Sequence, residues 1–311
     1  MVKRTSLGKH LKKLHLWEFI FYGVLIILVY ILISGNLFRT NSLEGFEETT
    51  DFIIKRGQEI YDDFYGNIYD DLVFNKIKND FEVGTIINKT GPTQESIILD
   101  VGSGTGHHVA AFEDNGYNAT GIDISPAMVK KAQKTYPGKS YMVGDVLKQM
   151  TFPAQSFTHI TCLYFTIYYI KNKRKFFKNC FDWLIPGGYL IVHLVDKNNF
   201  DPIIPAGDPF TILSPQRYAK KRITSTTVKF DKMDYKSNFE LLPNSTKAIM
   251  KETFKNNKNG NIRQNNHELY MPSQSTILGM AKDVGFIMDA QIDMMKCQYE
   301  SQYLYILQKP N

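Results

Sequence analysis

The sequence predicts an α/β fold with a mostly parallel sheet, and three observations support this prediction. Short apolar runs that suit buried strands alternate with segments that suit helices between residues 97 and 195. A glycine-rich turn, Ile97–Gly106 (IILDVGSGTG), connects the first of these strands to the first helix. Two further strands, 287–293 and 302–308, close the chain. The 311 residues, 43% of them hydrophobic, suffice for one large domain or two modest ones.

The first 60 residues differ in composition from the rest. Residues 1–15 carry five basic and no acidic residues, and Phe19–Phe38 contains no charged residue. Because about 20 apolar residues span a bilayer, we expect a single N-terminal transmembrane helix at residues 16–38. A cleaved signal peptide and a buried core helix are the alternatives. The polar, acidic stretch 39–60 is expected to be a linker.

The charges around this apolar segment give conflicting indications of its orientation. The positive-inside rule places residues 1–15 in the cytosol, which puts the large domain across the membrane. Three cysteines, an odd number without metal-ligand spacing, instead suit a reducing compartment. A basic start without acidic residues is also typical of organelle-targeting segments. We therefore expect a single-pass membrane protein and leave its compartment and orientation open.

The glycine-rich turn is a candidate ligand site, because glycine lets bare backbone approach a ligand closely. The dinucleotide fingerprint G-x-G-x-x-G would need a third glycine where this chain has His107, which argues against a nicotinamide enzyme. The spacing present is Asp100 followed by G-x-G-x-G. This pattern resembles the first motif of the class I S-adenosylmethionine-dependent methyltransferases.

The resemblance extends from about Tyr61 to the C-terminus. It includes YDDFYGNIYDDL at 61–72, DISPAM at 123–128, GDV at 144–146, LIPGG at 184–188 and the closing YLYILQKP. Thr158 stands where the family usually has an acid. The resemblance implies a Rossmann-like sheet of seven strands, mostly parallel with an antiparallel last strand, in a domain at 61–311. The segment 163–169 lacks the (D/N/S)-P-P-(Y/F/W) motif of enzymes that methylate bases, which argues against nucleic acid as a partner.

The resemblance also implies S-adenosyl-L-methionine as the cofactor and gives roles to particular residues. Asp123, about 20 residues after the glycines, suits the ribose hydroxyls, because a carboxylate can accept from both. Asp145 would lie near the adenine amino group. Tyr61 and Tyr65 would cover the methionine end, with a core stripe as the alternative. The expected cofactor-binding residues are Asp100, Gly102, Ser103, Gly104, Gly106, Asp123, Ile124, Met128, Asp145, Val146, Tyr61 and Tyr65.

A long insertion, residues 197–270, interrupts the resemblance. Its early prolines exclude a continuous helix, and Asn259-Gly260 predicts a hairpin turn. We expect a small antiparallel sheet that caps the site as a substrate lid. The stretch 211–270 has twelve basic and five acidic residues. This charge favours an anionic substrate or lipid headgroups, unless it is only a solvated lysine-rich surface.

Catalytic residues are less well indicated than cofactor residues. Methyl transfer needs a general base only if the acceptor must lose a proton early. The weak candidates are His193, Asp196, His267, Tyr164 and Tyr168. His107 and His108 are expected at the surface, and no metal site is expected. The acceptor can be a small molecule, a lipid or a protein, and a catalytically silent cofactor-binding or scaffold module is the alternative function.

Overall fold

The structure, a computed structural model, describes residues 21–25, 27, 52–203, 216 and 219–311. The chain divides into two units, Met1–Leu43 and Glu44–Asn311. Within the described ranges, no helix has both the length and the apolar character needed to cross a membrane. The anchor expected at 16–38 falls mostly outside these ranges, which contain only the helical residues 21–25 and 27 of it. The basic tail and the first half of the expected linker also lie outside them.

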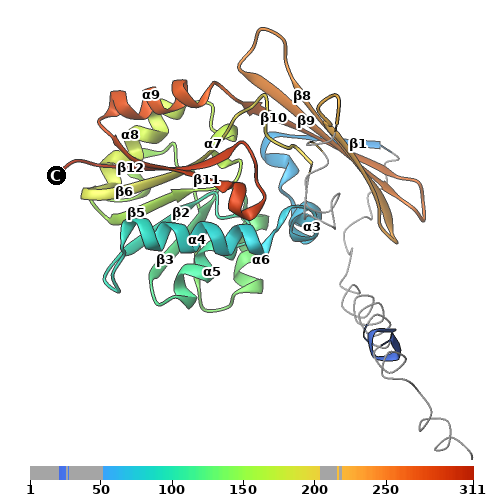
Figure 1. Cartoon of the computed structure of the whole chain (residues 1–311), viewed down its shortest axis with the longest axis horizontal. Helices are drawn as coiled ribbons and strands as arrows, with labels where there is room; N and C mark the ends of the chain where they lie inside the picture. The colour runs from blue at the N-terminus through green and yellow to red at the C-terminus, as the bar shows by residue number, and fades with distance from the viewer. Residues whose placement is uncertain (1–20, 26, 28–51, 204–215, 217–218) are drawn as a thin grey trace, which may run out of the picture. The chain divides into compact units, whose positions relative to one another are not determined.

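The larger of two sheets in the second unit has seven strands in the order β11-β12-β6-β5-β2-β3-β4 (Figure 1). Strands β6, β5, β2, β3 and β4 are mutually parallel, whereas β12 is antiparallel to both of its neighbours. This confirms the Rossmann-like sheet that the sequence motifs implied. The strands are β2 (Ile97–Val101), β3 (Asn118–Asp123), β4 (Ser140–Val143), β5 (Phe157–Cys162), β6 (Leu184–Val195), β11 (Ile287–Asp293) and β12 (Gln302–Gln308).

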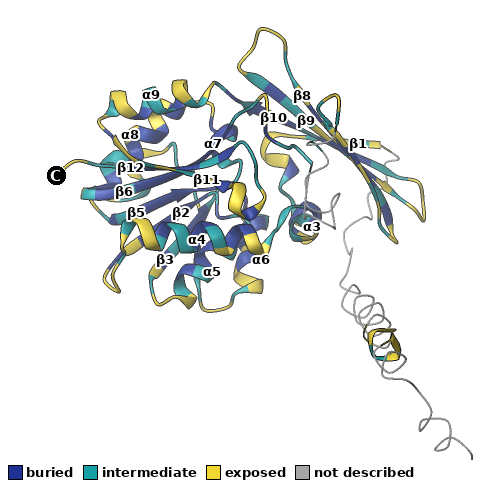
Figure 2. Cartoon of the chain, viewed as in Figure 1, coloured by how far each residue is buried: buried dark blue, intermediate teal, exposed yellow. Residues whose placement is uncertain are grey.

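Helices cover both faces of this sheet, and the core lies between the layers (Figures 1 and 2). One buried cluster joins the sheet to α4, α5 and α6, and the other joins it to α8, α9 and the short helix that follows β5. Ser125 and Ser273 cap their helices by accepting from the backbone N–H groups of Met128 and Thr276. The helices are α4 (Lys76–Thr90), α5 (His107–Asp114) and α6 (Pro126–Thr135), and then α8 (Lys173–Trp183) and α9 (Gln274–Val284).

Two segments differ in detail from the sequence prediction. The proline and two glycines of LIPGG predict a tight turn before a strand at 189–195, but β6 already begins at Leu184. Its register against β5 shifts after Phe157, so the segment enters the sheet through an irregularity. The apolar run 163–169 (LYFTIYY) predicts that β5 continues, but its last four residues form the short helix α7 (Thr166–Tyr169).

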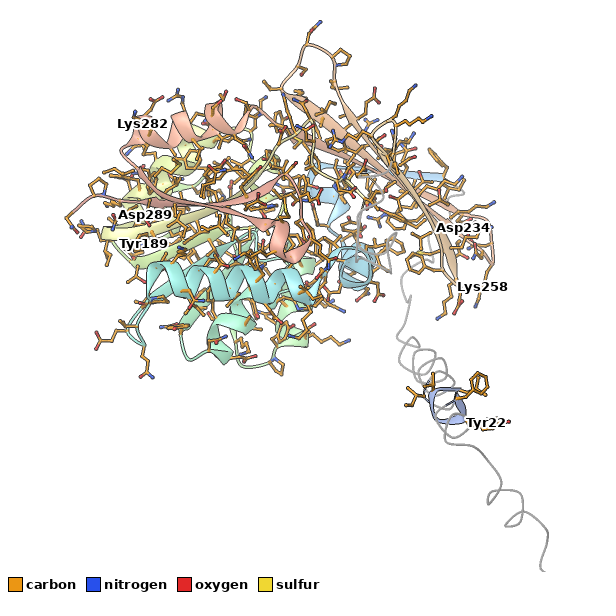
Figure 3. The ribbon with its side chains drawn as sticks, in the orientation of Figure 1. Tyr22, Tyr189, Asp234, Lys258, Lys282 and Asp289 are labelled. Carbon is orange, nitrogen blue, oxygen red and sulfur yellow. The ribbon has the colours of Figure 1, made fainter. Side chains whose placement is uncertain are left out.

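The second sheet, which we call the lid sheet, has five strands in the order β1-β10-β9-β8-β7. Four of them form the antiparallel sheet expected within the insertion. The fifth, β1 (Phe52–Arg56), comes from the stretch predicted to be a linker and pairs in parallel with β10. Asp234 and Lys258 mark the far tip of this sheet in Figure 3. The insertion strands are β7 (Ser225–Lys229), β8 (Met233–Leu241), β9 (Lys247–Asn256) and β10 (Ile262–Tyr270).

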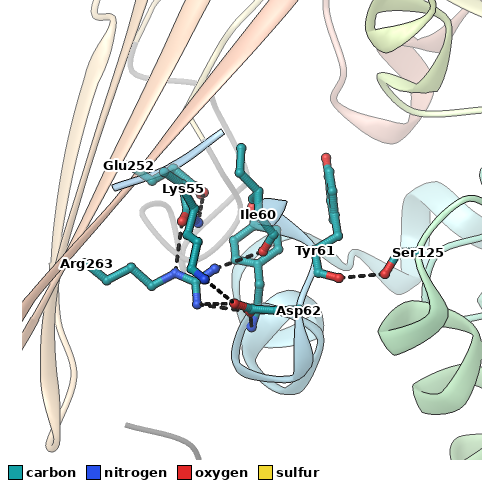
Figure 4. Close-up of polar contacts among 9 residues, drawn as sticks. Lys55, Ile60, Tyr61, Asp62, Ser125, Glu252 and Arg263 are labelled. Carbon is teal, nitrogen blue, oxygen red and sulfur yellow. Dashed lines mark hydrogen bonds and ion pairs between the residues drawn. The ribbon is translucent and has the colours of Figure 1, made fainter. Parts of the chain in front are cut away.

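A charged clamp connects the lid sheet to the segment that leads into α3 (Asp63–Val73) (Figure 4). The Arg263 guanidinium, on β10, donates from Nη1 to both Asp62 carboxylate oxygens at 2.9 and 2.8 Å. Its Nη2 donates to the Ile60 carbonyl at 2.9 Å. On the other side, Ser125 Oγ donates to the Tyr61 carbonyl at 2.6 Å. Residues 60–62 therefore bridge the lid sheet and the loop that follows β3.

Candidate active site

A cavity of about 1010 Å³ lies at the carboxyl ends of the parallel strands and reaches strands β9 and β10 of the lid sheet. Ligands bind at this edge in open α/β sheets. Every expected cofactor residue except Gly106 lines the cavity. Of the weak catalytic candidates, His193, His267 and Tyr164 line it, whereas Asp196 and Tyr168 do not.

The three glycines of the turn have positive φ angles of +67° at Gly102, +54° at Gly104 and +91° at Gly106. A Cβ on Gly102 would come within 2.4 Å of Thr166 Cγ2, and one on Gly106 within 2.6 Å of the Tyr141 hydroxyl. A Cβ on Gly104 would meet nothing closer than Met128 Cε at 3.6 Å. The protein's own packing therefore requires glycine at positions 102 and 106, while Gly104 has room on its cavity side.

Substitution of Gly106 tests this packing. Gly138 has a similar φ of +86° with no atom within 4 Å of its added Cβ, so it isolates the backbone strain. We expect Gly106→Ala to lower the free energy of unfolding by about 1–3 kcal/mol more than Gly138→Ala, because only the first overpacks. Urea unfolding of the two variants measures the difference. Equal losses would show that backbone strain alone sets the requirement.

Asp123 is the last residue of β3, and its carboxylate is hydrogen-bonded to the backbone of the glycine turn. Its Oδ2 accepts from the Gly104 N–H at 3.0 Å and its Oδ1 from the Ser125 N–H at 2.8 Å. Burial raises the pKa of this carboxyl in spite of these hydrogen bonds. Asp145, after β4, accepts from the Leu147 N–H at 2.9 Å and so orders its own loop at the cavity wall. Both acids lie where the sequence motifs placed them.

Asp100 is buried beneath the glycine turn. Its side chain is 2% exposed and Oδ1 accepts from the Thr161 hydroxyl at 2.6 Å. Burial raises its pKa. The carboxylate therefore connects β2 to β5 beneath the turn as well as lining the cavity.

Three tyrosines cover the cavity next to the turn. Tyr61 precedes α3 rather than lying within it, yet its ring contacts that of Tyr65 with centroids 5.5 Å apart. Tyr65 contacts Tyr69 at 5.8 Å, and Tyr69 Cε1 lies 4.0 Å from the position of a Gly104 Cβ. These rings form a continuous path from the turn toward the lid sheet. Tyr65 is also buried, as the core-stripe alternative predicts.

His267 is part of a hydrogen-bonded chain that sequence reasoning did not assemble. Its Nδ1 lies 2.8 Å from the Tyr169 hydroxyl and its Nε2 lies 2.7 Å from Glu252 Oε2. Glu252 also accepts from the Tyr235 hydroxyl at 2.8 Å and from the Asn265 amide at 3.2 Å. Burial tends to raise the pKa of Glu252, but His267 and the other donors outweigh it and lower that pKa. A buried, ionised carboxylate thus orients the histidine.

A second buried polar group lies on α4 and α5. Glu82 forms an ion pair with Lys78 and its Oε2 lies 2.9 Å from His108 Nε2. The Lys78 ammonium lies 3.5 Å from the centre of the Tyr164 ring. The expectation that His107 and His108 lie at the surface is wrong. His108 is buried against Glu82, and His107 stacks on Phe74 with ring centres 3.6 Å apart.

The remaining candidates have structural partners. His193 is fully buried, and its Nδ1 lies 2.6 Å from the Tyr164 carbonyl. Tyr168 accepts from the Val195 N–H at 2.8 Å within the core, away from the cavity. Asp196 accepts from the Asn198 N–H at 3.0 Å and orders the loop after β6. Among the described residues, no cluster of His, Cys, Asp or Glu suits a metal ion.

Residues 99–192 match the methyltransferase-domain family. Among curated relatives, the chain is 26% identical over 172 residues to phosphoethanolamine N-methyltransferase of Plasmodium falciparum, covering 52% of this chain and 61% of that protein. It is 33% identical over 108 residues to demethylmenaquinone methyltransferase of Chlorobaculum parvum, covering 34% and 44%. The chain therefore spans only 44% to 61% of the length of these relatives.

Solved structures give the same fold over more of the chain. The S-adenosylmethionine-dependent methyltransferase from Clostridium acetobutylicum superposes with a TM-score of 0.59 at 16% identity, covering 79% of this chain and 98% of that one. At that identity the similarity concerns the fold. Together with the match of residues 99–192 to the methyltransferase-domain family, it confirms the resemblance seen in the motifs: the chain has the fold of the class I S-adenosylmethionine-dependent methyltransferases.

Proposed function

We propose that the protein transfers a methyl group from S-adenosylmethionine to a small-molecule acceptor held against the lid sheet. One observation carries this proposal: the same cavity contains the glycine turn with Asp123 and polar side chains of strands β9 and β10. Methyl transfer needs the acceptor in line behind the methyl group and shielded from water. The names of the curated relatives, which refer to phosphoethanolamine and demethylmenaquinone, support an acceptor of small-molecule size.

The residues around the turn fit this cofactor. The second lone pairs of the Asp123 oxygens can accept from ribose hydroxyls while the backbone donors stay in place. Ile124 and Val146 give the adenine apolar neighbours beside Asp145, and the Gly102–Gly104 backbone lies open to the methionine end. Pockets for single ligands reach about 1000 Å³ at most, so this cavity has room for the acceptor as well.

When bound, the cofactor supplies a methyl group already activated on a sulfonium. The chain's own residues have to bind both molecules, orient the acceptor and keep water out. The tyrosines before and within α3 cover the turn, and the clamp between Arg263 and Asp62 fixes that segment to the lid sheet. The lid sheet thereby supplies one wall of the site through β9 and β10, and it fixes the position of the wall that the tyrosines form.

Calorimetry of the full chain in detergent with S-adenosylmethionine tests the cofactor site. Asp123→Ala should weaken binding about 10- to 100-fold, because charge-assisted hydrogen bonds contribute about 1.5–3 kcal/mol. Asp289→Ala is the matched control, since Asp289 is exposed on β11 (Figure 3). Absence of binding to the native chain, or equal affinity in Asp123→Ala, would contradict the proposal.

A labelled-methyl assay on metabolite and membrane extracts identifies the acceptor. Label is expected in a small molecule. Cofactor binding without transfer to any component of the extracts would instead indicate a catalytically silent binding module. Label in protein would move the acceptor class from small molecules to side chains.

We also propose that residues 16–38 anchor the protein in a membrane as a single span. The support is the uncharged stretch Phe19–Phe38 after a basic start. Extraction at alkaline pH tests the anchor, because an integral protein stays in the pellet. Protease protection of intact membranes then gives its orientation. Release at alkaline pH would contradict the anchor and leave the proposal for the catalytic domain untouched.

A further inference from the structure

We propose that Tyr169, His267 and Glu252 form a proton relay that takes the acceptor's proton, and that the acceptor group is therefore a hydroxyl or an ammonium. This inference rests on the proposed methyl transfer. Carboxylates already lack the proton at neutral pH, and thiols, with a pKa of about 8.5, lose it readily, so neither needs a relay. The three side chains come from three elements, α7, β10 and β9, and all three line the cavity.

The relay is a built arrangement rather than a chance contact. Two short hydrogen bonds, of 2.8 and 2.7 Å, place His267 between the Tyr169 hydroxyl and the Glu252 carboxylate. His267 is 2% exposed and Glu252 is 1% exposed. Tyr169 is only half-buried, so it is the member nearest to open space. Two further donors, Tyr235 and Asn265, fix the carboxylate.

The hydrogen bonds determine where the protons lie. An ionised Glu252 accepts only, so His267 Nε2 carries a proton and donates it. In the neutral imidazole, Nδ1 then accepts from the Tyr169 hydroxyl. Burial raises the pKa of Tyr169, which keeps the hydroxyl protonated and able both to donate and to accept. The Tyr61 hydroxyl donates to the same oxygen, whose remaining lone pair is left for a donor in the cavity.

Among the contacts that the described residues make with His267, Glu252 is the one charged group that can stabilise the protonated imidazole. The other groups packed on the ring are neutral phenols. Tyr61, Tyr65 and Tyr169 have ring centres 5.9–6.1 Å from it. Tyr235 reaches it only through the shared carboxylate. An imidazolium formed here is therefore paired at once with a carboxylate, which is the orienting role that an acid has beside a catalytic histidine.

The relay lies on the path to the glycine turn. Tyr169 contacts Tyr61 at 5.9 Å, and the rings continue through Tyr65 and Tyr69 to Gly104. A second buried histidine, His108, also lies beside a carboxylate, that of Glu82. The charge of that carboxylate is already paired with the Lys78 ammonium. Among the described cavity residues, the chain at His267 is thus the arrangement that combines a histidine with a half-buried tyrosine that lines the cavity.

The proton balance is simple. As the acceptor atom bonds to the methyl carbon, the bond from that carbon to sulfur breaks and its electron pair stays on sulfur. The acceptor's proton passes to the Tyr169 oxygen, before the new bond forms for an ammonium, which has no free electron pair, and as it forms for a hydroxyl. The Tyr169 proton passes to His267 Nδ1. The resulting imidazolium donates from Nε2 to Glu252. After product release, loss of the Nδ1 proton to solvent restores the starting state, with the remaining proton on Nε2.

The test compares Tyr169→Phe with Tyr168→Phe, which removes a hydroxyl that does not line the cavity. The probe is labelled S-adenosylmethionine with the low-molecular-weight fraction of an extract from cells that make the protein. Tyr169→Phe should lower the transfer rate at pH 7 about 100-fold, since general base catalysis contributes 10²–10⁴-fold. The deficit should narrow as the pH rises, because hydroxide can then take the proton. Tyr168→Phe should keep the native rate and pH profile.

Two readouts separate a relay from a packing role. Calorimetry should give Tyr169→Phe the native affinity for S-adenosylmethionine. Nitrogen NMR of the histidine-labelled full chain, with His267→Gln for assignment, should show the His267 tautomer with its proton on Nε2. A proton on His267 Nδ1, or a native rate and pH profile in Tyr169→Phe, overturns the relay while methyl transfer stands. Absence of transfer and of cofactor binding in the native chain overturns both.

Discussion

Glu82→Ala is expected to lower the free energy of unfolding by about 3–5 kcal/mol. Glu82 is fully buried on α4, where one oxygen contacts the Lys78 ammonium and the other lies 2.9 Å from His108. Burial tends to raise the pKa of Glu82, but Lys78 and His108 lower it to about 2, so the group is ionised. Its removal leaves the Lys78 ammonium, 1% exposed, without its counter-ion.

Urea unfolding measures this loss against a control on the same helix. Asp80→Ala removes an exposed acid that pairs with Lys76 four residues earlier, and it should cost less than about 1 kcal/mol. The double variant Lys78→Met/Glu82→Leu should recover most of the stability, because apolar residues of similar volume can replace a buried pair. If Glu82→Ala unfolds like Asp80→Ala, the buried pair does not stabilise the fold.

Acidification from pH 6.5 to 4 is expected to lower the free energy of unfolding by several kcal/mol. Burial lowers the pKa of His159 and of His193 to about 4. Both titrate near 6.5 when unfolded, so in this window the unfolded chain binds more protons than the folded one. Their contribution is complete above pH 6.5 and falls as the pH drops to 4. Each histidine accounts for about 3 kcal/mol at most, since one pKa unit corresponds to about 1.4 kcal/mol.

Urea unfolding at several pH values measures the slope. His193→Gln and His159→Gln should each remove about half of it, because glutamine does not titrate. Asp100 and Asp123 act in the opposite direction near pH 4, since burial raises their pKa values and the folded state binds their protons more readily. A profile that stays flat between pH 6.5 and 4 would contradict the burial of the two histidines as neutral rings.

Local patterns predicted the parts of the fold that local physics determines. The glycine turn and the closing hairpin each depend on residues close to one another in the sequence. The lid strands followed from proline positions and from Asn259-Gly260. Asp123 and Asp145 could be placed because a parallel sheet brings the ends of its strands to one edge.

The rest depended on contacts that no local pattern reveals. Glu252 lies in the strand segment KETFKN, whose polar composition predicts a solvent-exposed acid. In the structure it is buried, with Asn265 directly opposite on β10. Residues 263–268 of β10 are all polar, so the sequence has no alternation of polar and apolar residues that would distinguish the inner face of the strand from the outer one. Lys78 and Glu82 likewise have the spacing of a surface ion pair on a helix.

The parallel pairing of β1 with β10 has a consequence for the order in which the protein is made. Phe52 pairs with Ile262, so β1 is synthesised more than 200 residues before its partner. At about 5–20 residues per second, this strand waits roughly 10–40 s on the ribosome. The whole Rossmann-like core up to β6 is translated in that interval. The sheet that begins first in the sequence is therefore completed late, and contacts of such long range slow folding.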